Sequence, residues 1–378
     1  MTRYQEMIRP VWAEIDLAAI RHNLGEIRRA VGPKVKIMAV VKAEAYGHGA
    51  APIARAALAA GAEWLGVSSP EEGISLREQG IGAPILVFGP LQTDQVEAIV
   101  GHRLTPTICQ REPAEALSRA AVENGEKIAV HLKLDTGMGR IGIPAAEALS
   151  FASWLGSLPG LTLQGVFSHL ARADEDDKTH ALEQVRSFRR ACGELLGAGL
   201  NPSLLHLANS AAIISLPQAH FNLVRAGIML YGLRPSPGMD MAGVELRPAL
   251  ALKTRVVFVK RVPGGTGLSY GHIYRTSAEA TIATLPIGYA DGWFRSLSNK
   301  AKVLIGGRRY PIVGRICMDQ CLADLGDDGV DAGAEAVLIG RQGQEEITAD
   351  EVAAAAGTIN YEVVCAISDR VPRIYRGG

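Results

Sequence analysis

A lysine, a tyrosine and a glycine-flanked histidine lie close together near the start of the chain. Lys42 follows the apolar, β-branched run Val35–Val41, which is typical of a strand buried on both faces. Tyr46 and the turn 47–49 come next, and an alanine-rich helical pattern runs from Ala50 to Ala60. A lysine amine can form a Schiff base with an aldehyde, and a helix N-terminus after a glycine turn suits an anion. The grouping therefore predicts pyridoxal phosphate, although a solvated lysine at a strand end is the alternative.

Other predicted strands also end in polar residues. These are Lys133 with the loop 135–140, His169, the pair Asn209 and Ser210, and Arg225 with Gly227 and Ile228. Each of them alone could be a polar residue with an ordinary structural role. Because ligands of a parallel barrel bind at the carboxyl ends of its strands, their joint placement favours a single site.

The elements that must position these residues alternate regularly. Strands are predicted at Val35–Val41, Trp64–Ser68, Pro84–Phe88, Leu104–Ile108, Ile128–Leu134, Thr162–Ser168, Leu204–Leu207 and Leu223–Arg225. Helices are predicted at Leu17–Ala30, Ala50–Ala60, Pro70–Gln79, Gln92–Val100, Pro113–Glu123, Pro144–Leu155 and Asp176–Leu196. This alternation predicts an α/β fold, a (β/α)8 TIM-like barrel; the doubly wound open sheet is the competing architecture.

The pattern changes near residue 245, from which extended segments follow one another. They are Leu250–Val262, Ala280–Leu285, Lys302–Ile305, Tyr310–Val313, Gln320–Asp324, Ala336–Ile339 and Val363–Ser368, with one helix at Thr348–Ala356. We therefore expect a barrel domain over residues 1–240 and a mainly β C-terminal domain over 241–378. The first strand, Val11–Asp16, could pair with the second domain.

Composition narrows the class of protein. The chain has 378 residues, 48% hydrophobic and 21% charged, and a formal net charge of zero, which is usual for a globular enzyme. The sequence has no block of basic residues, so we expect no nucleic-acid partner. It also has no long apolar run and no signal-peptide core, so we expect no membrane association and a cytoplasmic location. The five cysteines are scattered, and Cys317 and Cys321 have no second ligand pair, so neither disulfides nor a metal is expected.

The segment Gly137–Gly142 also matches the dinucleotide pattern Gly-x-Gly-x-x-Gly. That fingerprint should open a helix and be followed by an acidic residue at the end of the next strand. Here Pro144 begins the helix later, and the next strand ends in Ser168 and His169. The pattern is therefore a weak indication of a nicotinamide site.

Two longer motifs resemble one known family. The run from Val40 to Gly49 (VVKAEAYGHG) resembles the cofactor-lysine motif of alanine racemases, with Glu44 where the family usually has aspartate. The run from Val130 to Arg140 (VHLKLDTGMGR) closely resembles a second signature of the same family. The resemblance implies that Arg140 donates to the phenolic oxygen of the cofactor and helps to hold the substrate carboxylate. It also implies that Lys133 is carbamylated and orients Arg140, whereas pairing with Asp135 is the alternative role of an unmodified lysine.

The resemblance places Arg225 against the pyridine nitrogen of the cofactor. Most pyridoxal phosphate enzymes place a carboxylate there, which keeps the ring protonated. An arginine cannot accept that proton, so the ring should be a weaker electron sink, as suits a racemase. The remaining cofactor-binding residues implied by the resemblance are Tyr46, His169, Asn209, Ser210, Gly227, Ile228 and Tyr361, beside Lys42 itself.

Racemisation requires an acid or base on each face of the α-carbon. Lys42 can serve one face, and Tyr270, in the Ser-Tyr-Gly loop 269–271, resembles the catalytic tyrosine of the family. A phenol needs a cationic network to act as a base, and Arg225 acting through His169 could supply one. Family motifs also match Met318 as a substrate contact and Tyr289 and Asp319 at the entrance. In the family the tyrosine and methionine reach the other subunit, so a head-to-tail homodimer with shared active sites is expected.

The resemblance thus implies an isomerase of the amino-acid racemase type. It would interconvert L-alanine and D-alanine by two bases acting on a pyridoxal phosphate aldimine and supply D-alanine for peptidoglycan. A serine or broad-specificity racemase remains an alternative, because small pocket changes alter specificity and leave the motifs intact. An amino-acid decarboxylase is a second alternative, and Arg225 argues against it. A non-catalytic cofactor carrier is a third, and Tyr270 argues against that one.

Overall fold

The computed structural model describes residues 9–377 and divides the chain into two compact units. The barrel unit comprises Ile20–Ala45 and Ala50–Arg247, and the β unit comprises the residues up to Ala19, Tyr46–Gly49 and the chain from Pro248 onwards. Residues 1–8, in which we predicted no signal-peptide core, lie outside the described residues. No helix within residues 9–377 is long and apolar enough to cross a membrane.

Eight parallel strands form the barrel unit, which confirms the predicted fold class. In spatial order they are β10 (Leu223–Ala226), β2 (Lys36–Val40), β3 (Trp64–Val67), β4 (Ile85–Pro90), β5 (Thr105–Ile108), β6 (Ile128–Asp135), β8 (Leu161–Phe167) and β9 (Leu204–His206). A two-residue strand, β7 (Ile143–Pro144), also pairs with β6. Two hydrogen bonds between backbone groups near β9 and β10 nearly close the ring, from the Arg225 amide to the Ala208 carbonyl (3.1 Å) and from Asn222 to Leu205 (3.4 Å).

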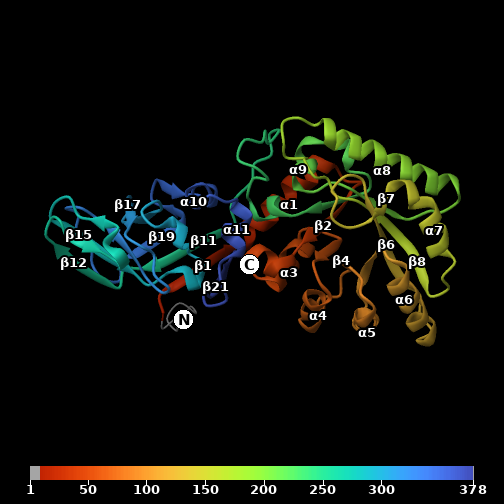
Figure 1. Cartoon of the computed structure of the whole chain (residues 1–378), viewed down its shortest axis with the longest axis horizontal. Helices are drawn as coiled ribbons and strands as arrows, with labels where there is room; N and C mark the ends of the chain where they lie inside the picture. Colours follow the sequence, from red (N-terminus) through yellow and green to blue (C-terminus); the bar gives the residue numbers. More distant parts are fainter. Residues whose placement is uncertain (1–8, 378) are drawn as a thin grey trace. The chain divides into compact units, whose positions relative to one another are not determined.

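Helices lie between the strands in the predicted order (Figure 1). They are α1 (Leu17–Val31), α3 (Ala50–Ala59), α4 (Pro70–Glu78), α5 (Val96–Gly101), α6 (Arg111–Glu123), α7 (Ala148–Gly156), α8 (Thr179–Gly197) and α9 (Ser210–Ser215). Most bounds agree with the sequence prediction to within a few residues. The short α9 was not predicted, because six residues are too few to show a helical period.

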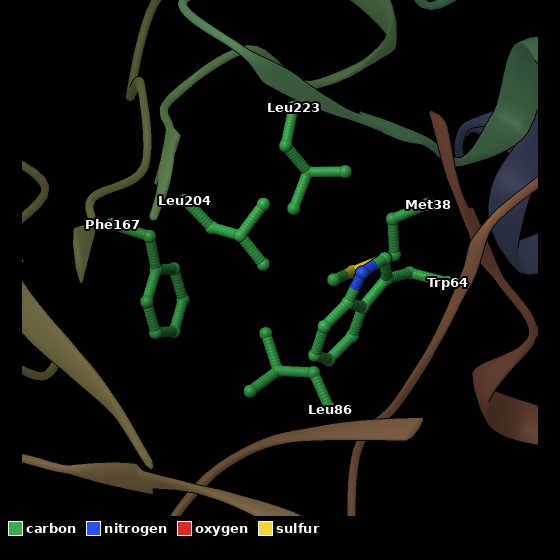
Figure 2. Packing of buried hydrophobic residues seen from close by; sticks show 6 residues of the cluster. All are labelled: Met38, Trp64, Leu86, Phe167, Leu204 and Leu223. Atoms are coloured by element: carbon green, nitrogen blue, oxygen red, sulfur yellow. The ribbon is translucent and has the colours of Figure 1, made fainter. Parts of the chain in front are cut away.

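Side chains from six barrel strands meet in the interior of the barrel. Figure 2 shows them pointing towards one another: Met38, Trp64, Leu86, Phe167, Leu204 and Leu223, each at most 5% exposed. Alternate residues of a strand face the same side, so one set from each strand fills the interior. The barrel is therefore packed below its mouth, and a ligand site can form only at the strand ends.

The β unit contains a long sheet with the order β12 (Phe258–Val262), β15 (Ala280–Leu285), β18 (Cys321–Asp324), β17 (Arg308–Val313), β16 (Lys302–Ile305), β19 (Glu335–Gln342), β11 (Leu250–Arg255), β1 (Val11–Asp16) and β21 (Arg373–Arg376). The short β20 (Glu345–Ile347) extends β19, and β13 (Gly267–Leu268) pairs with β14 (Tyr274–Arg275). Helices α10 (Ala349–Ala356) and α11 (Asn360–Cys365) complete the unit. Strand β1 is antiparallel to β11 and parallel to β21, so the first strand of the chain belongs to this sheet.

Two strand predictions in this unit are wrong. The run Val363–Ser368, predicted as a strand, begins within helix α11, whose buried side chains are Asn360, Val363 and Val364. A short apolar run does not distinguish a strand from one buried helix face. The single predicted strand Leu250–Val262 is broken in two, because the Val256 amide donates to Ala334 and the Val257 amide to Thr284, which changes the neighbouring strand.

The turn that follows β2 is left-handed. In α2 (Lys42–Gly47), the φ angles of Ala43, Glu44, Ala45 and Tyr46 are 51°, 51°, 52° and 54°. An L-residue in this conformation costs about 1–2 kcal/mol, so surrounding contacts must hold the turn. We expected the helix after this turn to offer its N-terminus to a phosphate, but a carboxylate oxygen of Glu44 accepts from the Ala50 amide at 3.1 Å. The first helical amide is thus already bonded to a carboxylate of the chain itself.

The far end of this turn is held by the C-terminal part of the β unit. The Gly47 carbonyl accepts from Nε of Arg373 (3.0 Å), and the His48 carbonyl accepts from the Tyr375 hydroxyl (3.2 Å). A Cβ at Gly47 would lie 2.1 Å from the carbonyl oxygen of Val364. Glycine is therefore required at position 47 by its conformation and by close packing.

Substituting Gly47 tests this packing. Gly47→Ala should lower the free energy of unfolding by about 3 kcal/mol, because overpacking adds to the cost of a positive φ. Gly32→Ala is a matched control, because Gly32 has nearly the same φ (77° against 80°) and a Cβ at that position would have no other atom within 4 Å. Gly32→Ala should lower the free energy of unfolding by only about 1 kcal/mol. Equal losses in urea-induced unfolding would contradict the packing argument.

Candidate active site

The carboxyl ends of the barrel strands bring four cationic side chains together around His169. Burial lowers the pKa of His169 well below its usual value, and Arg225, Lys133, Arg140 and Lys42 lower it further. His169 is therefore neutral at neutral pH. Because the guanidinium groups of Arg225 and Arg140 converge with Lys42 at one mouth, the site suits an anionic ligand.

Arg225, on β10, is the centre of this arrangement and is only 4% exposed. Its Nη1 donates to Nδ1 and to the carbonyl of His206, both at 3.0 Å. Its Nη2 donates to the carbonyls of Ser168 (2.8 Å) and Leu207 (2.9 Å) and to Nδ1 of His169 (3.2 Å). None of its described partners is a carboxylate. Burial lowers the pKa of Arg225 to about 9, so the guanidinium remains charged at neutral pH.

One donor of Arg225 remains available. Among residues 9–377, the hydrogen bonds of Arg225 use Nη1 and Nη2 and none uses Nε–H. A neutral pyridine nitrogen has one lone pair and no hydrogen, and it is a suitable acceptor for this donor. The residues present therefore fit the predicted cofactor in its form with an unprotonated ring.

A second cradle lies at the ends of β9 and β10. The Ser210 hydroxyl accepts from the amides of Gly227 (3.0 Å) and Met229 (3.4 Å), and Asn209 caps α9 by accepting from the Ala212 amide (3.1 Å). The structure thus joins Ser210 to the loop that contains Gly227 and Ile228. The Ser210 hydroxyl, which accepts from these two amides, can still donate its own hydrogen to a phosphate oxygen.

Lys133 is buried and lies beside two arginines. Desolvation lowers its pKa well below the usual value, and Arg225 and Arg140 lower it further, so the site favours the neutral amine. Its nitrogen lies 4.2 Å from the centre of the Phe167 ring. No ion pair between Lys133 and Asp135 occurs in the described residues. The Asp135 carboxylate instead accepts from the amides of residues 137–139 at 2.9–3.2 Å, which fixes the loop that leads to Arg140.

The predicted tyrosine loop lies in the β unit, between β13 and β14. Tyr270 is 71% exposed. The preceding Ser269 has a φ of 58°, and its hydroxyl donates to the Arg315 carbonyl at 2.6 Å. A Cβ at Gly314 would lie 2.8 Å from that of Ser269. The loop is therefore held against the segment that contains the predicted Met318.

The other predicted residues of the β unit lie on adjoining loops. The Tyr289 amide donates to the Cys317 carbonyl (3.1 Å), and the Ala290 amide donates to that of Met318 (3.0 Å). Asp319 pairs with Arg370 at 2.6 Å. Tyr289 and Met318 are 43% and 53% exposed, so these loops present several large side chains to solvent in a single chain.

Tyr46 and Tyr361 are brought together within the β unit. Their ring centres are 6.2 Å apart, and Tyr46 is 9% exposed. Burial raises the pKa of Tyr46 and thereby keeps its hydroxyl protonated. A protonated phenol can donate to a phosphate oxygen, which is compatible with the predicted phosphate-side role.

Three buried polar residues of the site were not predicted. Gln184 on α8 donates to the His169 carbonyl (3.0 Å) and to the Thr136 hydroxyl (3.3 Å), so it joins two loops of the mouth. His131 and His206 form a hydrogen-bonded pair below Arg225. Only His131 had a sequence signal, because it lies two residues before Lys133 on one strand and therefore faces the same side.

Comparisons with known protein families cover both units. Residues 15–235 match the family described as the alanine racemase N-terminal domain, and residues 249–375 match the C-terminal domain. Alanine racemase from Desulfovibrio desulfuricans is 47% identical over 367 residues, covering 97% of this chain and 98% of that protein. The Symbiobacterium thermophilum enzyme is 49% identical, covering 98% of each.

Solved structures lead to the same family as the sequence comparisons. Alanine racemase from Clostridium difficile has a TM-score of 0.93 at 40% identity, covering 98% of this chain and 96% of that one. Alanine racemase from Bacillus anthracis, solved with bound L-Ala-P, has a TM-score of 0.91 at 42% identity with the same coverage. The likeness extends over nearly the full length of every protein compared.

Proposed function

We propose a residue-level mechanism for this chain, which belongs to the alanine racemase family of pyridoxal phosphate-dependent isomerases. The family interconverts L-alanine and D-alanine and supplies D-alanine for peptidoglycan. The single observation that supports the mechanism best is the buried Arg225, whose Nε–H remains available and which has no carboxylate among its described partners. A decarboxylase would need a carboxylate at that position.

Pyridoxal phosphate, when bound, withdraws electrons from the α-carbon of the amino acid and so makes its hydrogen acidic. We assign Lys42 to the aldehyde carbon, Arg225 to the ring nitrogen, and Arg140 to the phenolic oxygen and the substrate carboxylate. Ser210, Gly227 and Ile228, with Tyr46 and Tyr361, would hold the phosphate. The capped helix α9 and the bonds from Ser210 to the Gly227 loop support this assignment. His169 and Asn209 would complete the wall of the site.

Two groups exchange the proton. Tyr270 would remove it from L-alanine, and Lys42 would remove it from D-alanine; each returns a proton to the face on which it acts. Arg225 limits how far the ring accepts charge, because its guanidinium disfavours a proton on the ring nitrogen. Arg225 would thereby favour the return of the proton to the α-carbon over other reactions.

Lys133 would act as a carbamate. A neutral amine can add to carbon dioxide to give a carbamate anion and release one proton, and the depressed pKa of Lys133 supplies that amine. The anion would then pair with Arg140 and keep its guanidinium oriented towards the substrate. The absence of a Lys133–Asp135 ion pair among the described residues supports this role over an ordinary salt bridge.

The active form would be a head-to-tail homodimer. Tyr270, Tyr289 and Met318 are large side chains exposed in the single chain, as residues of a subunit interface are before association. Mixing Lys42→Ala with Tyr270→Ala protein tests it: one site of a mixed dimer has both bases if the tyrosine serves the other subunit. Restored activity is expected, and an inactive mixture that sediments as dimers would contradict shared sites.

We also propose a cytoplasmic location, where alanine and the cofactor are metabolites. Cell fractionation tests it. Racemase activity recovered with an envelope marker would contradict the proposal.

Deuterium exchange tests the reaction. Incubated with L-alanine in heavy water, the loaded enzyme should give D-alanine carrying α-deuterium, as measured by proton NMR and chiral chromatography. Tyr270→Phe should slow exchange from L-alanine by about 10²–10⁴-fold and that from D-alanine far less, because it removes only one of the two bases. Alanine that keeps its proton and its configuration in the presence of bound cofactor would refute the assignment.

Carbon-13 NMR tests the modification of Lys133. Protein equilibrated with [13C]bicarbonate should show one carbamate resonance that is absent from Lys133→Met. Lys127→Met is a control, because it removes an exposed lysine near the same strand. A spectrum that is identical for wild type and Lys133→Met would exclude the carbamate.

A further inference from the structure

His131 has no place in the mechanism, yet it is fully buried in the barrel. It lies on β6, and its ring is close to those of Trp64 (5.2 Å between centres) and Phe167 (6.4 Å). An imidazole in such apolar surroundings must be hydrogen-bonded to avoid a desolvation cost. Among the described residues only its Nδ1 is hydrogen-bonded, and its buried Nε2 has no partner, so the bond at Nδ1 indicates what the residue does.

A chain of hydrogen bonds joins His131 to the active site. Nδ1 of His131 lies 2.9 Å from Nε2 of His206, and Nδ1 of His206 lies 3.0 Å from Nη1 of Arg225. Arginine only donates, so Nδ1 of His206 must accept. Neutral His206 then carries its hydrogen on Nε2 and donates it to Nδ1 of His131. The direction of both bonds is thus set by the guanidinium.

The other protonation states are disfavoured. Burial lowers the pKa of His206 well below its usual value, with smaller contributions from His131, Arg225 and Lys133 in the same direction. Burial also lowers the pKa of His131 to about 3, although the Gln164 side chain acts in the opposite direction. Both rings are neutral at neutral pH. Without an acceptor at His131, the second tautomer of His206 would become competitive and would direct an N–H at Arg225.

The neighbouring strand makes room for this ring. Gly165 on β8 faces His131 in register, and a Cβ at Gly165 would lie 2.7 Å from three atoms of the imidazole. Gly165 does not have a positive φ, so the space it leaves for the imidazole, and not its backbone conformation, explains the glycine. The backbone of β8 thus holds His131 in the position from which it can accept from His206.

We propose that His131 is a positioning residue for racemisation: by accepting from His206 it holds the tautomer that accepts from Arg225, and so fixes the guanidinium at the ring nitrogen of the cofactor. The proposal rests on the assignment of Arg225 made above. His131 contacts neither substrate nor cofactor in this account. It acts through two successive hydrogen bonds, and its loss should alter the electronic state of the ring.

Substitutions at His131 separate this role from packing. His131→Leu fills the space without an acceptor, whereas His131→Asn keeps an oxygen near the position of Nδ1. In His131→Leu the pH midpoint of the visible absorption of the bound cofactor should rise by about one unit. The turnover number should fall roughly ten- to hundredfold, the effect of one lost hydrogen bond to a charged group, while the KM changes little. His131→Asn should restore most of the wild-type absorption midpoint and most of the turnover number.

Gly165→Ala perturbs the His131 ring through the neighbouring strand β8. It should displace the imidazole and change the absorption as His131→Leu does, and the double variant should show no further change. Gly193→Ala is the control, because nothing lies within 4 Å of a Cβ there. If His131→Leu does not fold, the other two variants still test the proposal. The absorption midpoint of His131→Asn must resemble that of the wild type, and the midpoint of Gly165→Ala must differ from it.

The possible outcomes decide between these roles. An unchanged absorption midpoint in His131→Leu and Gly165→Ala overturns the proposal. It is also overturned if His131→Asn changes the midpoint and the turnover number as much as His131→Leu does. Arg225→Gln, measured in parallel, separates the two levels of the argument. If it shifts the midpoint while the His131 variants do not, only the role of His131 fails; if it has no effect either, the assignment of Arg225 fails as well.

Discussion

A buried, charged guanidinium with no carboxylate among its described partners dominates the barrel mouth. Burying such a group is unfavourable unless its donors are bonded, and Arg225 meets this demand with three carbonyls and two imidazoles. All of them are neutral, so the positive charge is held in place and not cancelled. Burial lowers the pKa of Lys133 and of His169, and the charge of Arg225 lowers both further, which favours a nucleophilic amine and keeps the imidazole neutral. Among the neighbouring charges, Arg225 thus has the largest effect on both groups.

The cofactor lysine is positioned by a different constraint. Its left-handed turn is locally unfavourable and persists because distant parts of the chain bond to it. Within the β unit, Arg373 and Tyr375 bond to the carbonyls of Gly47 and His48, and α11 packs against Gly47. The C-terminal strand therefore holds the end of this turn at Gly47 and His48.

Much of this arrangement could be predicted from the sequence. The eight barrel strands show strong apolar runs, and the polar residues at the ends of five of them locate the mouth, so Lys42, His169, Ser210 and Arg225 could be placed together. The left-handed turn could not, because Ala43, Glu44 and Ala45 favour ordinary helix and only tertiary contacts reverse their φ. The roles of His206 and Gln184 depend on contacts between distant strands and helices. Tyr270 was assigned by family resemblance, since nothing local distinguishes it from other turn tyrosines.

Nitrogen-15 NMR of the enzyme loaded with ring-labelled pyridoxal phosphate tests the central claim most directly. If Arg225 donates to the ring nitrogen, that nitrogen should have the chemical shift of an unprotonated pyridine near neutral pH and show no coupling to a bound hydrogen. Arg225→Glu should produce the protonated shift. A protonated ring nitrogen in the wild-type enzyme would contradict the account, because the guanidinium would then not govern the chemistry of the site.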